Sequence, residues 1–116
     1  MLGRMDSEPV TLLTKAILLD GVRRGARTIE LRDTGFAVRL MYFAEGMWVE
    51  GMTIPAKLHA PVVETLAGFA AINPQRRSKG GFELIVGAAN VRYQFDLELR
   101  GPTTFQVSVR KVSLPN

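Results

Sequence analysis

One short segment brings together the side chains best suited to bind an anion: Gln75-Arg76-Arg77-Ser78-Lys79-Gly80-Gly81 holds three cations beside two glycines. Guanidinium and ammonium groups bind phosphates and carboxylates, and glycine amides can add further donors. The segment therefore predicts an anion or nucleotide contact made by Arg76, Arg77, Lys79, Gly80 and Gly81. The competing interpretation is a solvated loop, whose cations face the carbonyl end of the preceding helix and whose glycines serve the turn.

The rest of the sequence has no pattern typical of catalysis. His59 is the only histidine and cysteine is absent, so a metal site would lack its usual ligands. The serines have no base nearby in the sequence, and no pair of carboxylates stands out on one predicted element. We expect a chain that is not an enzyme and that uses no cofactor.

A second set of candidate residues is apolar and surrounds the Ala44-Glu45-Gly46 turn: Phe43, Met47 and Trp48, with further methionines nearby in the sequence. Core packing is the usual role of such side chains. If they are exposed, they instead indicate a protein-binding patch, because monomers seldom leave large apolar patches in water. Phe43, Met47 and Trp48 are therefore the candidate partner surface.

Composition sets the class of protein. The chain has 116 residues, 47% apolar and 22% charged, which suits one soluble globular domain. Its first residues contain no continuous apolar segment, so we expect neither a secretory signal nor a membrane span, and a cytoplasmic protein. The net charge of +4 comes from cations scattered along the whole chain. Without aromatic residues spaced for base stacking, this charge does not favour nucleic-acid binding.

Hydrophobic periodicity predicts two helices and two groups of three strands. The first helix runs from Pro9 to Arg24 and ends at Gly25. The second runs from Pro55 to Ile72, with its regular part starting near Pro61. Alternating apolar residues predict six strands, at positions 28–32, 36–43, 47–50, 82–86, 91–98 and 105–109. In the second strand, we expect one face to enter the core: Phe36, Val38, Leu40 and Tyr42.

The order of these elements predicts an α+β fold, one antiparallel sheet in helix-βββ-helix-βββ order with a PAS-like layer architecture. We expect a flexible N-terminus over residues 1–8, one domain over 9–112 and a short tail over 113–116. A sheet of this kind leaves at least one edge strand open, and edge strands pair readily with a neighbour. The fold class alone thus favours an interaction role, with a protein partner or with self in a homo-oligomer.

Several segments, taken in order, resemble one known family. Gly25 to Leu31 is similar to its Arg-Ala-Ser-Asp-Ile-His-Ile strand, and Glu45 to Trp48 to its Asp-Gly-Val hairpin. Leu66 to Phe69, Gln75 to Arg77 and Gly80 to Phe82 are similar to its Met-Ala-Gly-Leu, Glu-Arg-Arg and Gly-Arg-Phe pieces. The family is that of the type II secretion and type IV pilus motor ATPases, and the resemblance, from about Thr14 to Val112, is to the PAS-like domain that precedes their motor core.

This resemblance implies a module that packs against a motor ATPase in an oligomeric assembly. It gives Arg76 and Arg77 a possible place near the nucleotide at the domain boundary. The sequence also departs from the family: the arginine expected after Asp96-Leu97 is Glu98, and the phosphate-cradling Gly-x-x-x-x-Gly-Lys-Ser/Thr loop is absent. We therefore expect a non-catalytic protein-interaction or assembly module. The alternative is a small-ligand or nucleotide sensor that uses the Arg76, Arg77 and Lys79 loop.

Overall fold

The computed structural model describes residues 2–71, 79–87, 89–100 and 104–112, with side chains from Glu8 onward. Within these residues the elements, in order, are α1 (Leu2–Arg23), β1 (Thr28–Asp33), β2 (Ala37–Ala44), β3 (Met47–Pro55), a 3-10 turn η1 (Ala56–Leu58), α2 (His59–Phe69), β4 (Lys79–Val86), β5 (Val91–Leu99) and β6 (Thr104–Lys111). The chain is α+β. The predicted order of helix, three strands, helix and three strands is confirmed.

All six described strands form one antiparallel sheet in the order β3-β2-β1-β6-β5-β4. Each group of three strands is a meander, and the two meanders join at the centre of the sheet, where β1 pairs with β6. Thr28 lies opposite Ser108 across this seam, and Leu31 lies opposite Phe105. The strands left at the two edges are β3 and β4.

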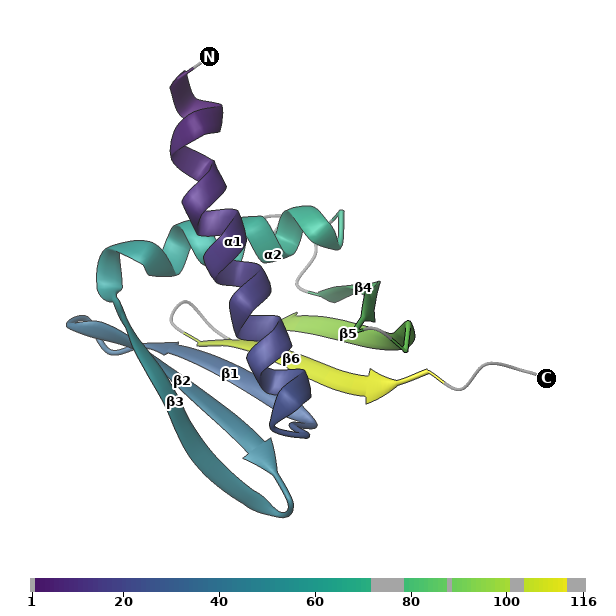
Figure 1. Cartoon of the computed structure of the whole chain (residues 1–116). Helices are drawn as coiled ribbons and strands as arrows, with labels where there is room; N and C mark the ends of the chain where they lie inside the picture. The colour runs from purple at the N-terminus through teal and green to yellow at the C-terminus, as the bar shows by residue number, and fades with distance from the viewer. Residues whose placement is uncertain (1, 72–78, 88, 101–103, 113–116) are drawn as a thin grey trace.

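Both described helices cover the same face of the sheet, and neither lies on the other face (Figure 1). The core between the two layers is apolar. Alternate residues of the strands enter it, as predicted for Val38, Leu40 and Tyr42 in β2 and for Phe105, Val107 and Val109 in β6. Aromatic rings connect α2 to the sheet, since Phe82 lies 5.5 Å from Phe69 and 5.3 Å from Phe95 between ring centroids.

Phe36 was predicted to face the core, and this prediction is wrong. The side chain is 94% exposed. Asp33 Oδ1 accepts a hydrogen bond from the Gly35 amide at 2.8 Å, and Gly35 has a φ of 89°. Phe36 therefore belongs to the turn, and β2 begins at Ala37, one residue after the predicted start.

The helices differ from the predictions at their ends. α1 begins at Leu2, seven residues before the predicted start at Pro9. Its other end is as predicted, because Gly25 has a φ of 68° and its amide bonds to the Val22 carbonyl. α2 begins at His59, which places Pro61 in the first turn, where a missing N–H has little cost.

Candidate protein-binding site

The β2–β3 hairpin positions all three residues of the predicted partner surface. Its turn is Glu45-Gly46, and both residues have a positive φ, 53° and 77°. Two-residue turns of this kind match the right-handed twist of the strands they join. The turn fixes the register of the hairpin, which sets Phe43 opposite Trp48 and Ala44 opposite Met47.

Phe43 and Trp48 form an aromatic pair on the face of the sheet that carries no helix. Their ring centroids are 5.2 Å apart, with the planes tilted by 58°. Such cross-strand pairs stabilise a hairpin by about 0.2–1 kcal/mol. Phe43 is half-buried by this contact, whereas Trp48 on the edge strand remains 46% exposed. The pair thus supports the hairpin and still presents apolar surface.

Met47 and Val49 point to the opposite face of the same hairpin, the side on which the helices lie. They are nevertheless exposed, 67% and 42%, because the hairpin extends beyond the end of α1 (Figure 1). They line a shallow hollow of about 290 Å³ together with Arg24, Tyr42, Ala44 and Glu45. The end of the hairpin therefore exposes apolar side chains on both faces of an edge strand.

The base of the hairpin is anchored to α1 through Tyr42, whose side chain is fully buried. The Arg24 guanidinium lies 5.0 Å from the centre of the Tyr42 ring, and Arg24 Nε lies 3.0 Å from Asp20 Oδ2. Burial, with the Asp20 carboxylate adding to it, raises the pKa of the Tyr42 hydroxyl well above its ordinary value of 10.0. The hairpin therefore has a part that packs against α1 through Tyr42 and an end that is exposed.

The β3 edge is irregular beyond this point. Its register with β2 shifts between the pair of Met41 with Glu50 and the pair of Arg39 with Thr53. A bulge of this kind bends a strand and limits how far a neighbour can pair with it. The regular part of the edge is thus the short segment from Met47 to Glu50.

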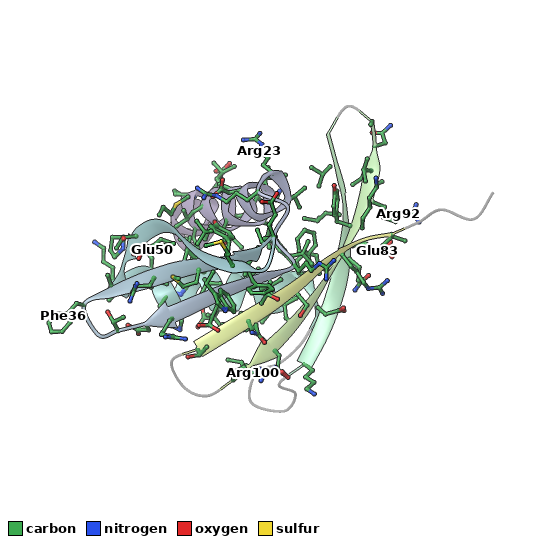
Figure 2. The ribbon with its side chains drawn as sticks, turned by 90° about the horizontal axis from the view of Figure 1, so that it is seen from below. Arg23, Phe36, Glu50, Glu83, Arg92 and Arg100 are labelled. Carbon is green, nitrogen blue, oxygen red and sulfur yellow. The ribbon has the colours of Figure 1, made fainter. Side chains whose placement is uncertain are left out.

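The uncovered face of the sheet is a different kind of surface, because its cations lie beside carboxylates. Six ion pairs between described residues lie on it: Arg32 with Glu30, Arg39 with Glu50, Lys79 with Glu98, Arg92 with Glu83, Arg100 with Glu98 and Arg110 with Asp96. Figure 2 views this face from below, with Glu50, Glu83, Arg92 and Arg100 labelled. The six cations are shared among five acids, because Glu98 pairs with both Lys79 and Arg100, so most of the positive charge on this face has a carboxylate close by.

The predicted anion-binding segment is only partly described. Arg76 and Arg77 lie outside the described residues. Lys79, Gly80 and Gly81 belong to the edge strand β4 rather than to a loop. Lys79 Nζ lies 3.6 Å from Glu98 Oε2, and Arg100 Nε lies 2.9 Å from Glu98 Oε1, so the Lys79 charge has a carboxylate partner.

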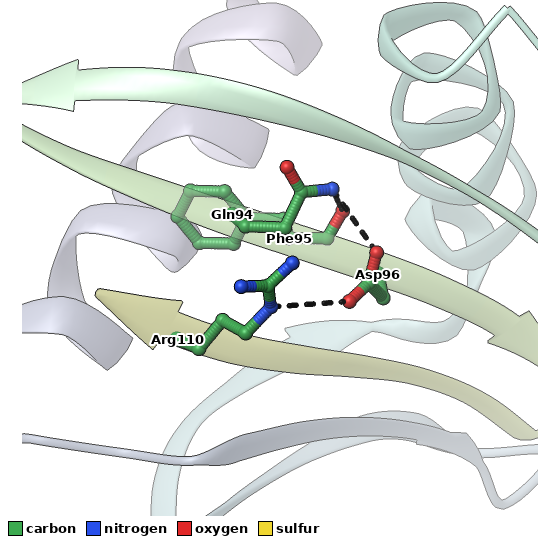
Figure 3. A network of polar contacts seen from close by, with 4 residues as sticks. All are labelled: Gln94, Phe95, Asp96 and Arg110. Atoms are coloured by element: carbon green, nitrogen blue, oxygen red, sulfur yellow. Dashed lines mark hydrogen bonds and ion pairs between the residues drawn. The ribbon is translucent and has the colours of Figure 1, made fainter. Parts of the chain in front are cut away.

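Gly81 has a packing role. It lies opposite Asp96, whose Oδ1 accepts a hydrogen bond from Gln94 Nε2 at 3.0 Å, while Asp96 Oδ2 lies 4.0 Å from Arg110 Nε (Figure 3). A Cβ at position 81 would come within 2.7 Å of both Gln94 Nε2 and Asp96 Oδ1. The missing side chain at position 81 therefore leaves space for this network.

The structure brings Phe43, Met47 and Trp48 together at one end of the sheet, about as the sequence pattern indicated, and adds Val49 to them. Val49 could have been included, since it alternates with Trp48 along the strand as Met47 does. His59 has no metal-binding neighbours: across the described part of the chain, no three His, Asp or Glu side chains are grouped to hold an ion. Of the helices in that part, none is both long enough and apolar enough to cross a membrane.

The comparisons with protein-family models and with curated proteins identify no relative of this chain. A scan against protein-family models finds no match, and a search of curated proteins finds none either. The hypothesis about function therefore depends on the geometry of the hairpin and on the resemblance given above.

Proposed function

We propose that this chain is a non-catalytic assembly module whose binding surface is the β3 edge between Met47 and Glu50, and that its first partner is a second copy of the chain. The observation that carries the proposal is an edge strand with apolar side chains exposed on both faces. Added strands gain main-chain hydrogen bonds from such an edge and side-chain contacts from the residues that alternate along it.

The sequence of this edge is self-complementary in one register. If two β3 strands pair antiparallel around a two-fold axis at Trp48, each Trp48 meets its counterpart and each Met47 meets a Val49. In the same register, Glu45 lies opposite Gly51 and Glu50 lies opposite Gly46, so no two carboxylates meet. Centring the pair on Val49 would instead set Trp48 against Glu50. The register at Trp48 is therefore the favourable one.

Residues around the segment also support this register. The Phe43 rings would flank the two Trp48 rings on the uncovered face, since Phe43 already packs against Trp48. The segment from Met47 to Glu50 contains no lysine or proline, which edge strands often carry to prevent such pairing. The resemblance to the pre-motor domain makes a secretion or pilus motor ATPase the next partner to test.

A charge-swap experiment tests the proposal. In light scattering after size exclusion, we expect the wild type to form dimers and Trp48→Lys or Trp48→Glu each to be monomeric, because each new charge would face its own copy. A mixture of the two variants should regain the dimer, since a lysine then faces a glutamate. The matched control is Ile85→Lys, which adds the same charge to an exposed residue on the other edge strand, β4.

Two results would contradict the proposal. One is a wild type that stays monomeric at concentrations near 1 mM, the upper range for weak association. The other is a loss of dimer in Ile85→Lys that equals the loss in Trp48→Lys. A mixture of the two Trp48 variants that stays monomeric would exclude the register centred on Trp48.

A further inference from the structure

A second hollow, separate from the hairpin, differs from the other hollows in its charge. It has a volume of about 510 Å³ and is lined by Val22, Gly25, Ala26, Arg27, Tyr93, Val109, Arg110 and Lys111. Its charged lining residues are all cations. The other described hollows each include a carboxylate: Glu45 beside the hairpin, Glu30 near Trp48, and Asp96 with Glu98 near Lys79.

The end of α1 and the pairing of three strands create this hollow. α1 ends at Arg23, and Val22 and Gly25 at this end of the helix line the hollow. In the sheet that lines the hollow, the Val109 amide donates a 2.8 Å hydrogen bond to the Arg27 carbonyl, and Tyr93 lies opposite Lys111. Arg27 and Lys111 alternate in phase with Ile29 and Val109, so both point to the helix side of the sheet.

The cations of the hollow have charge available for a ligand. Neither Arg27 nor Lys111 has an ion pair with any described residue, and both are exposed. Arg110 also lines the hollow, but it alternates with Val109 and Lys111 along β6, so its side chain points to the uncovered face, where Asp96 is its ion-pair partner. A helix carbonyl end attracts cations and accounts for Arg23 in the last turn of α1. It does not account for Lys111, which comes from β6.

The floor of the hollow is apolar. Val22 and Ala26 form one wall, Val109 is buried, and the half-buried Tyr93 adds an aromatic ring. Sites for small molecules typically occupy about 300–1,000 Å³ and combine apolar walls with a few polar groups. A phosphoryl group offers oxygen acceptors to guanidinium and ammonium donors, and an attached apolar body can cover the floor.

We propose that this hollow, at the junction of Arg27 and Lys111, binds an organic phosphate, with the phosphoryl group on these two cations and the apolar body against Tyr93 and Val109. The site is independent of the β3 edge. It also differs from the segment of Arg76, Arg77 and Lys79 that the sequence singled out.

Three probes separate the parts of such a ligand: ADP, inorganic pyrophosphate and adenosine. Binding to the wild type is measured by calorimetry and by amide shifts at Arg27, Val109 and Lys111. We expect ADP to bind most tightly, pyrophosphate to bind more weakly because it lacks the apolar body, and adenosine to bind negligibly. ADP affinity should fall as salt rises from 50 to 300 mM, because the contacts are ionic and exposed.

A matched pair of double variants localises the site. Arg27→Gln with Lys111→Gln should weaken ADP binding by about tenfold or more, the effect expected for lost charged hydrogen bonds. Lys15→Gln with Lys57→Gln removes the same charge from exposed residues that do not line the hollow, and should stay within about twofold of the wild type. All four side chains are exposed, so thermal unfolding should show that both variants remain folded.

Some outcomes would overturn the proposal. They are an absence of ADP binding at millimolar concentration, an equal loss of binding in the two double variants, or shifts confined to amides outside the hollow. Equal affinity for pyrophosphate and ADP would overturn the role given to the apolar floor, and equal affinity for adenosine would overturn the role given to the cations.

Discussion

Tyr42 occupies the space in which any side chain at position 51 would have to lie. A Cβ on Gly51 would overlap Cε2 of the Tyr42 ring and would lie 3.2 Å from Cζ. Gly21 of α1 lies on the helix side of the same ring, where an added Cβ would be 3.5 Å from Cε1. The Tyr42 ring is thus packed between β3 and α1, with a glycine in each.

This packing predicts a large effect for a small change. Gly51→Ala should lower the free energy of unfolding by about 1–3 kcal/mol, since the new methyl group must displace the buried Tyr42 ring. Urea unfolding measures the change. Gly68→Ala is the control: position 68 is on α2, and apart from the helix's own backbone an added Cβ would meet no described atom within 4 Å, so this variant should be about 0.5–1 kcal/mol more stable. Equal stabilities for Gly51→Ala and the wild type would show that the ring moves without cost.

The Tyr42 hydroxyl should make stability depend on pH in alkaline solution. Its pKa is raised above 10.0 in the folded chain, mainly by burial, so the folded state keeps the proton that the unfolded state releases. This contribution is complete below pH 10 and is lost as the pH rises further. Above pH 10, the free energy of unfolding of the wild type should fall faster with pH than that of Tyr42→Phe. The two slopes should differ by about 1.4 kcal/mol per pH unit. Urea unfolding between pH 9 and 11.5 tests this, and parallel curves for the two proteins would contradict it.

Two phenylalanines from predicted strands, Phe95 and Phe36, should respond differently to truncation. Phe95 is fully buried and stacks on Phe82, so Phe95→Ala should cost about 3–5 kcal/mol. Phe36 lies in an exposed turn, and Phe36→Ala should change stability by less than about 0.5 kcal/mol. Thermal or urea unfolding distinguishes them, and a loss at Phe36 near that at Phe95 would mean that Phe36 is buried in solution.

The ion pairs on the uncovered face should contribute little to stability. Glu98 has two cationic neighbours, Lys79 and Arg100, but the three side chains are partly or largely exposed. Glu98→Gln should therefore cost less than about 1 kcal/mol. The difference should shrink at 1 M salt, where screening acts within about 3 Å. A loss above about 2 kcal/mol that salt does not reduce would indicate that Glu98 acts by another mechanism.

Local patterns were enough to predict the order of the elements and most of the core. The alternation around Val38, Leu40 and Tyr42 and around Phe105, Val107 and Val109 needs only the two-residue period of a strand. The same pattern misplaced Phe36, because an apolar residue in a turn continues the alternation although the strand has not begun. The exposure of Met47 was left open, since it depends on where α1 ends relative to the hairpin. The exposure of Trp48 was left open too, since it depends on which face of the sheet the helices cover.

The cationic hollow could not be predicted in this way. Arg27 and Lys111 are near opposite ends of the chain and come together only because β1 pairs with β6. No periodicity within either meander specifies that pairing. Each meander has two edge strands, and either one could have paired with the other meander. The position of Gly81 in β4, opposite Asp96, likewise depends on the register of two strands rather than on its place after a basic segment.

The seam between β1 and β6 has a consequence for the order in which the fold forms. Within each meander, the strands that pair follow one another directly in the sequence, whereas the seam joins the first described strand to the last. Bringing them together restricts nearly the whole chain at once, and contacts so distant in sequence are the slow ones to form. The rate-limiting step of folding should therefore be the meeting of two preformed halves at the middle of the sheet.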